Sequence, residues 1–218
     1  MARDVGSAKT EHGGGDQPGE ADDNSGEERL SHETLIMSPS PFILEWIARC
    51  APANRGAARA FDVAMGRGRH AVALALAGYR TFGVDLNLDA VRDAISAAKA
   101  NEVVVLGWCA DLTRTPLPDA HFDVVVVTRY LQRDLFPSVR NAVLPGGVVL
   151  YETFTVAQRA LGRGPTSPDH LLEPGELRAR FDGFEVLFYK EVTAPDAFAR
   201  IAARRPPRAM ERPPLGGP

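Results

Sequence analysis

The feature that most constrains the fold is an alternation of strand-like and helix-like segments through the middle of the chain. Runs of β-branched and apolar residues are each followed by a stretch with helical periodicity, which is typical of a parallel sheet with crossover helices. Strands are expected at residues 60–65, 80–85, 103–109, 122–128 and 147–153, and helices at residues 41–49, 70–77, 88–100, 135–143 and 174–181. The sequence therefore predicts an α/β fold with a doubly wound, Rossmann-like sheet.

The middle and the end of this pattern refine the prediction. The run from Val124 to Val127 is apolar on both faces, as in a central strand that helices cover on each side. Two more strands are expected at residues 185–189 and 198–203, with little room for a helix between them. We therefore expect a mostly parallel sheet that ends in an antiparallel strand pair.

The two ends of the 218-residue chain differ in composition from its middle. Residues 1–33 carry three basic and nine acidic side chains and almost no large apolar ones, so ordering them would bury too little surface to offset the lost entropy. Residues 204–218 are rich in proline and arginine, which disfavours a regular helix or an interior strand. We predict a disordered acidic arm at 1–33, one domain at 34–203 and a disordered tail at 204–218.

The charge balance excludes some classes of partner. The formal net charge is -3, and outside the acidic arm 22 basic side chains face 19 acidic ones. This near-neutral body lacks the broad basic surface that nucleic-acid binding usually needs, and its longest apolar runs are too short to span a membrane. We expect neither nucleic acid nor membrane as a partner, and the choice between monomer and dimer stays open.

The cysteines and the N-terminus bear on location. Cys50 and Cys109 are too few for a disulfide framework. Their surroundings look like a helix and a buried strand, so we expect both to be reduced core residues. The N-terminus has no apolar segment that would serve as a secretory signal, and its acidity disagrees with an organellar transit peptide. The predicted location is therefore the cytoplasm.

A glycine-containing turn follows the first expected strand. Gly66 and Gly68 lack the Cβ atoms that would block the approach of a ligand to the backbone, and the next helix directs its free N–H groups at the same crevice. The spacing of Gly66, Gly68 and Ala71 also fits a dinucleotide-binding turn, and a tight turn without a ligand is the alternative. Taken alone, this turn is a weak signal.

Each of the first three expected strands contains or is followed by an acid near its end. These acids are Asp62, Asp85 and Asp111. Because the carboxyl ends of parallel strands open on one crevice, the three side chains should converge there. Three carboxylates suit a ligand with an ammonium group, two ribose hydroxyls and an adenine amine, and they would repel a pyrophosphate. For each acid taken singly, a helix cap or a turn residue is the alternative.

Five segments match, in order and spacing, the motifs of a known family. They are residues 61–68, 83–86, 110–112, 122–126 and 144–147. Together they resemble the class I S-adenosylmethionine-dependent methyltransferases, over about residues 38–203. The resemblance implies an enzyme that takes S-adenosylmethionine as its cofactor. The chain departs from the family at Ala64, where glycine is usual.

The resemblance also implies which residues bind the cofactor. They are Asp62, Ala64, Gly66, Gly68, Asp85, Leu86, Asp111, Leu112 and Thr128. The glycine turn with Asp62 would hold the methionine part, Asp85 the ribose hydroxyls, and Asp111 with Leu112 the adenine. Thr128 would line the floor of the site.

The second half of the chain is similar to a narrower group. Residues 151–155, 172–177 and 184–191 resemble the tellurite-resistance methyltransferase and related small enzymes. The resemblance implies a small-molecule acceptor, namely a soft thiol, a chalcogen-type nucleophile or a small anion. An ionised soft acceptor needs no general base, so we name no catalytic residue, and we predict no metal site.

Arginines near the expected position of the acceptor favour an anion. Arg129, Tyr130 and Arg133 follow the fourth strand, and a helical segment there would place both arginines on one face. Two guanidiniums would bind a small anion through charge-assisted hydrogen bonds, and pairing with nearby acids is the alternative. The polar loop at residues 157–170 adds Arg163 and is expected to close over the substrate.

Two other interpretations stay open at this point. The spacing of Gly66 and Asp85 also suits an NAD-dependent oxidoreductase, although Asp62, Asp111 and the terminal strand pair disagree with it. A cofactor-binding module without catalysis is the third interpretation, because the sequence does not identify the acceptor.

Overall fold

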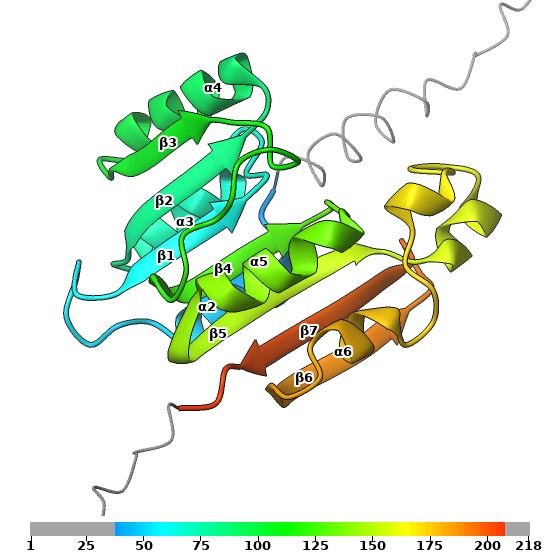
Figure 1. Ribbon diagram of the computed structural model, residues 1–218. Coiled ribbons are helices and arrows are strands. Elements are labelled where there is room, and N and C mark those ends of the chain that lie inside the picture. The colour runs from blue at the N-terminus through cyan, green and yellow to red at the C-terminus, as the bar shows by residue number, and fades with distance from the viewer. Residues whose placement is uncertain (1–37, 208–218) are drawn as a thin grey trace, which may run out of the picture. The chain divides into compact units, whose positions relative to one another are not determined.

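The computed structural model describes residues 38–207, which form a seven-stranded sheet with helices on both faces (Figure 1). The strand order is β3-β2-β1-β4-β5-β7-β6. The strands are β1 (Arg59–Val63), β2 (Arg80–Asp85), β3 (Val105–Cys109), β4 (Phe122–Thr128), β5 (Val143–Phe154), β6 (Glu185–Val192) and β7 (Phe198–Arg204). Strands β1 to β5 are parallel, and β7 pairs antiparallel with β5 and β6. The predicted fold class, including the antiparallel pair at the end, is confirmed.

Helices and short 3-10 segments connect these strands. Within residues 38–207 they are α2 (Pro41–Arg49), α3 (Arg69–Leu76), α4 (Leu88–Ala100), α5 (Phe136–Ala142), α6 (Glu176–Arg180), η1 (Arg133–Leu135), η2 (Val156–Leu161) and η3 (Pro168–His170). Local sequence sets their starts. Asn87 caps α4, because its Oδ1 accepts from the N–H groups of Asp89 and Ala90 at 2.9 and 3.2 Å.

The core lies on both faces of the sheet. Helices α2 and α3 cover one face and α5 and α6 the other (Figure 1). The α2 and α3 side buries Phe42, Ile43, Trp46, Leu74, Val124, Val126 and Leu150. The opposite side buries Phe61, Val125, Val127, Phe136, Val139, Leu177 and Phe181. Strand β4 therefore contributes to both cores, which confirms the prediction of a central strand covered on each face.

The position of β3 at the edge of the sheet changes one expectation. Cys109, the last residue of β3, is exposed, so the prediction that it is a core residue is wrong. An edge strand has a neighbour on only one side, and the sequence did not reveal which strand would take that place. Cys50 is half-buried, and both cysteines are free thiols.

Some predictions fall on parts of the chain that the structure does not describe. The predicted acidic arm at 1–33 lies outside the described residues, as does the predicted tail beyond residue 207. The described elements run from Pro41 to Arg204. Within residues 38–207, every helix is too short or too polar to cross a lipid bilayer.

Candidate functional site

The turn after β1 has an unusual backbone. Ala64, Gly66 and Gly68 all have positive φ, at 53°, 54° and 80°. A Cβ added to Gly66 would meet no atom within 4 Å, whereas one added to Gly68 would lie 2.5 Å from the Cβ of Ala94. Gly68 is therefore required by the packing of α3 against α4. Gly66 instead leaves an open approach to the backbone.

Ala64 has the conformation that glycine adopts readily, at the position where the family usually has glycine. We expect Ala64→Gly to raise the free energy of unfolding by about 0.5–1 kcal/mol, because relief of left-handed strain outweighs the added freedom of the unfolded chain. Chemical denaturation measures this change. The helical control Ala97→Gly should instead lower stability by about 0.5–1 kcal/mol. A loss of stability in both variants would contradict the strain at Ala64.

A cavity of about 240 Å³ opens at the carboxyl ends of the first three strands. Its lining comes from the ends of β1, β2 and β3 and from the segment after β4. The lining residues are Ala64, Asp85, Leu86, Ala110, Asp111, Leu112, Thr113 and Tyr130. The structure therefore brings together five of the nine predicted cofactor-binding residues, and Leu86 presents a side chain that is 69% exposed at this cavity. Tyr130, predicted beside the acceptor, lines the same cavity.

Asp85 and Asp111 also organise their own turns. Asp85 accepts from the N–H of Gly66 at 2.7 Å and from that of Asn87 at 2.9 Å, so its carboxylate fixes the glycine turn. Asp111 accepts from the backbone N–H and the hydroxyl of Thr113 at 2.9 and 2.7 Å, and these hydrogen bonds lower its pKa. Each carboxylate oxygen has two lone pairs, so a role in the turn leaves room for a ligand.

Asp62 differs from the other two acids because it is fully buried. By distance and angle neither carboxylate oxygen has a hydrogen-bond partner, although the backbone N–H of Ala71 lies close enough to lower the pKa of Asp62, and the exposed fraction of Asp62 is 0%. Burial raises the pKa of Asp62 to about 7. A cation beside Asp62 would favour its ionised form, so this carboxylate is suited to an ammonium group.

The buried polar atoms without hydrogen-bond partners belong to very few residues. Among the described residues they are Oγ of Ser40, both carboxylate oxygens of Asp62 and Nε of Arg129. Electrostatic coupling links Arg69 to both Asp62 and Arg129, so these groups lie near one another. Native proteins rarely leave such atoms unpaired, and a ligand is one explanation of a group of them.

Thr128 is the last residue of β4 and directly precedes Arg129. Its hydroxyl lies 3.1 Å from Nδ1 of His70, whose ring is buried at the start of α3. The other ring nitrogen, Nε2, accepts from the backbone N–H of Ser40 at 2.9 Å. Sequence reasoning did not select Ser40, Arg69 or His70. The position of Arg69 and His70 directly after Gly68 was the signal that could have found two of them.

Arg129 is held in a left-handed backbone conformation, with φ of 52°. Its N–H donates to the backbone oxygen of Glu152 at 2.8 Å, and its guanidinium lies 5.8 Å from the centre of the Phe198 ring. Among the described residues it forms no ion pair. The segment from Arg129 to Gln132 is not helical, so the condition for a helix face shared by Arg129 and Arg133 is not met.

The other two predicted arginines have partners within the protein. Arg133 binds both carboxylate oxygens of Glu176, at 2.8 and 2.9 Å, and donates to the backbone oxygen of Leu171 at 2.8 Å. Arg163 pairs with Asp196 at 3.1 Å. The structure therefore places Arg133 and Arg163 in the scaffold of the neighbouring loops and leaves Arg129 as the cation without an acidic partner.

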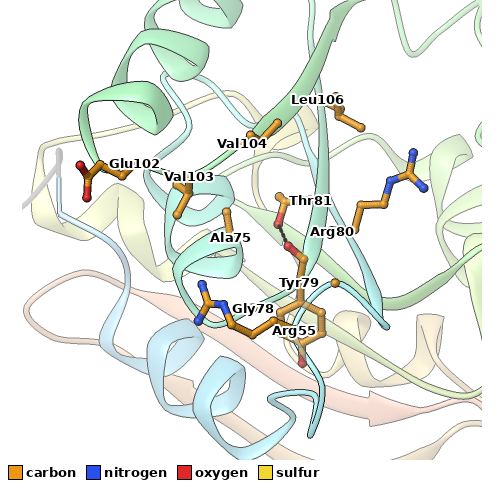
Figure 2. A pocket seen from close by; sticks show the side chains of 11 residues that line it. Arg55, Ala75, Gly78, Tyr79, Arg80, Thr81, Glu102, Val103, Val104 and Leu106 are labelled. Carbon is orange, nitrogen blue, oxygen red and sulfur yellow. Dashed lines mark hydrogen bonds between the residues drawn. The ribbon is translucent and has the colours of Figure 1, made fainter.

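A second cavity, of about 380 Å³, lies at the opposite ends of the strands from the glycine turn. Its lining comes from the amino ends of β2 and β3 and includes Arg55, Tyr79 and Glu102 (Figure 2). The hydroxyl of Thr81 donates to the backbone oxygen of Tyr79 there, at 3.3 Å. In open α/β sheets ligands bind at the carboxyl ends of the strands, so the cavity beside the glycine turn is the candidate site.

The family to which this arrangement corresponds follows from a comparison with known sequences. Residues 60–147, from β1 to the start of β5, match the family described as "Methyltransferase domain". The chain therefore contains a methyltransferase domain at these residues, and this match supports the class I assignment that the sequence motifs implied. The protein is an S-adenosylmethionine-dependent enzyme, as the sequence motifs implied, and the NAD-dependent alternative receives no support. No curated protein sequence matches the chain significantly.

Solved structures share the fold of this methyltransferase. TehB from Haemophilus influenzae has 16% identity and a TM-score of 0.64, with 82% of this chain and 66% of that chain covered. An S-adenosylmethionine-dependent methyltransferase from Mesorhizobium loti has 22% identity and a TM-score of 0.59, with 74% and 98% covered. The [4+2]-cyclase SpnF has 16% identity and a TM-score of 0.60, with 76% of this chain and 80% of that chain covered. These likenesses establish the fold.

The residues present fit the cofactor of this family. Asp62 offers buried acceptor atoms without partners to an ammonium group, and Gly66 leaves its backbone accessible. Leu86 and Leu112 line the cavity beside Asp85 and Asp111, which combines apolar surface for a flat base with acceptors for hydroxyl and amine groups. The individual roles of these residues are part of the proposal below.

Proposed function

We propose that this methyltransferase acts on a small anionic acceptor, of the thiolate or chalcogen type, and that Arg129 binds the anion. The observation that supports the proposal most directly is that Arg129 is a cation without an acidic partner among the described residues. Its Nε is buried and has no partner, and the residue lies in a strained backbone next to the end of β4. Strained backbone of this kind is often found at functional sites.

We assign the cofactor to the crevice between the glycine turn and the cavity. Asp62 faces the ammonium group and Gly66 allows the close approach of the methionine part. Asp85 binds the ribose hydroxyls, and Asp111 with Leu112 binds the adenine. Ala64, Leu86 and Tyr130 complete the walls of the cavity, and Thr128 forms the floor. Gly68 supports the site through the packing of α3 on α4.

The cofactor supplies a methyl group that is already activated by a sulfonium. The protein's own task is to align the acceptor with that methyl group and to exclude water. Arg129 would hold the anion through charge-assisted hydrogen bonds, which orient it and add binding energy in a partly buried setting. No side chain needs to remove a proton from an acceptor that binds ionised.

Arg133 and Arg163 enter the proposal in a changed role. Both were predicted to contact the substrate, and both are paired within the protein. We propose that they hold the loop at residues 157–170 in place. Gln158, which is fully buried, assists by donating to the backbone oxygen of Arg163 at 3.1 Å and accepting from the N–H of Ala197 at 2.7 Å.

Replacement of Arg129 tests this function. We expect Arg129→Gln to raise KM for an anionic acceptor about tenfold or more, because a charge-assisted hydrogen bond is lost, while the affinity for S-adenosylmethionine stays nearly constant. Methyl transfer to a panel of thiols and chalcogen oxyanions identifies the acceptor, and calorimetric titration measures cofactor binding.

The exposed arginine of α2 provides the matched control. Arg49→Gln removes the same charge from a side chain that is 59% exposed, so KM should not change. A tenfold loss of cofactor affinity in Arg129→Gln would place Arg129 in the cofactor site, and an unchanged KM would end the anionic-acceptor proposal. Titration of the parent protein with NAD should show no binding.

A further inference from the structure

His70 is a buried histidine whose two ring nitrogens are both engaged. It is the second residue of α3 and its side chain is 1% exposed. Nε2 accepts a hydrogen bond from the backbone N–H of Ser40 at 2.9 Å, and Nδ1 lies 3.1 Å from the hydroxyl oxygen of Thr128. The ring therefore connects the start of α2 to the end of β4.

These two contacts determine where the proton of His70 is. A backbone amide can only donate, so Nε2 must present its lone pair to Ser40. The neutral ring then carries its single proton on Nδ1, and that N–H donates to the Thr128 oxygen. The ring stays neutral at ordinary pH because burial, with the charges of Arg69 and Arg129, lowers the pKa of His70 to about 3.

The proton on Nδ1 in turn fixes the role of the Thr128 hydroxyl. Its oxygen accepts from His70, so its own proton is free to be donated elsewhere. Within the described part of the chain, the only hydrogen bond of this hydroxyl is the one to His70. Glu152 lies opposite Thr128 in the register of β4 and β5, and its carboxylate pairs with Arg200 at 2.5 Å and forms no hydrogen bond with the Thr128 hydroxyl. Among residues 38–207 the hydroxyl proton therefore has no acceptor.

We propose that His70 is a positioning residue that holds the Thr128 hydroxyl as a hydrogen-bond donor to the anionic acceptor. Thr128 and Arg129 are consecutive at the end of β4, the Thr128 hydroxyl contacts the His70 ring, and the charge of Arg129 acts on the same ring, so a neutral donor and a charged donor lie near one point. This inference rests on the proposed function and narrows it, because the acceptor must offer an anionic atom that takes hydrogen bonds from both. Thiolates and chalcogen oxyanions meet this requirement.

Two amide substitutions separate the two contacts of His70. The side-chain nitrogen of asparagine falls near the position of Nδ1, so His70→Asn keeps a donor to Thr128. The side-chain amide of glutamine falls near the position of Nε2, so His70→Gln keeps the partner of Ser40. We expect KM for the anionic acceptor to rise about tenfold in His70→Gln and less than about threefold in His70→Asn. Both should bind S-adenosylmethionine with nearly parental affinity.

Threonine substitutions provide the matched controls. Thr128→Val should raise KM for the acceptor about tenfold, and combination with His70→Gln should add little, because both changes remove one donor. Thr81→Val removes another buried hydroxyl, at the amino end of β2 (Figure 2). This change should leave KM for the acceptor unchanged. Equal impairment in His70→Asn and His70→Gln, or an unchanged KM for the acceptor in Thr128→Val, would overturn the proposal.

A spectroscopic measurement keeps this inference independent of the proposed function. Nitrogen-15 NMR of the parent protein should show the His70 ring protonated at Nδ1 and unprotonated at Nε2 from about pH 5 to 8. The opposite tautomer, or a ring that titrates in this range, would overturn the inference even if methyl transfer is observed. If no acceptor on the panel is methylated, the proposed function fails while the tautomer is still measured.

Discussion

Gly66→Val should lower the affinity for S-adenosylmethionine at least about 100-fold, or about 2.7 kcal/mol, while the protein stays folded. The added Cβ meets no protein atom within 4 Å, so the space that it enters is the space left open beside the turn. The φ of 54° at Gly66 also disfavours a branched residue, and a turn that moves to relieve this strain would release the hydrogen bond from its N–H to Asp85.

Gly146 provides a control because it also has a positive φ, which disfavours a branched residue. Its φ is 84° and an added Cβ there also meets nothing within 4 Å, but it lies near the start of β5, away from the carboxyl ends of the strands. Gly146→Val should lose a similar amount of stability and keep its cofactor affinity. Thermal unfolding and calorimetric titration measure the two effects separately. Equal cofactor affinity in the two variants would show that the backbone at Gly66 is not close to the cofactor.

Much of the fold could be predicted from the sequence because its signals are local. The β-branched runs gave the strands, and the boundaries of β2, α4 and β4 match the expected ones. The predicted helix at residues 135–143 is shorter, because η1 precedes it as a 3-10 turn and Val143 already belongs to β5. Such terminal turns depend on packing as well as on local sequence.

The site was predictable only where residues follow the ends of strands. Asp85, Asp111 and Leu112 line one cavity, as the rule for parallel sheets predicts. Which of the arginines forms an ion pair within the protein was not predictable, because the partner of Arg133 is Glu176, 43 residues away. The role of Ser40 depends likewise on its contact with His70, which is 30 residues distant. Contacts across such distances follow from the tertiary structure and leave no mark in local sequence.

The pair of Arg133 and Glu176 is expected to be a main source of stability outside the apolar core. The two side chains share two hydrogen bonds, and Glu176 is only 13% exposed. We expect Arg133→Gln to lower the free energy of unfolding by about 1–3 kcal/mol, because it leaves a largely buried carboxylate with weaker compensation. Denaturation measures the loss. Arg129→Gln, which breaks no ion pair in residues 38–207, should change stability far less.

The pH dependence of stability distinguishes this ion pair from simple packing. Burial raises the pKa of Glu176, but hydrogen bonds from Arg133, the N–H of Glu173 and Arg180 outweigh it and bring the pKa down to about 2. A carboxyl whose pKa is depressed in the folded state stabilises the protein above its unfolded pKa, here 4.5, and the stabilisation is lost as the pH falls through about 2. The difference in stability between the parent and Arg133→Gln should therefore be full at pH 6 and shrink between about pH 4.5 and 2. A difference that stays constant over this range would show that Arg133 stabilises the fold through packing and its contacts with backbone oxygens, and not through the charge of Glu176.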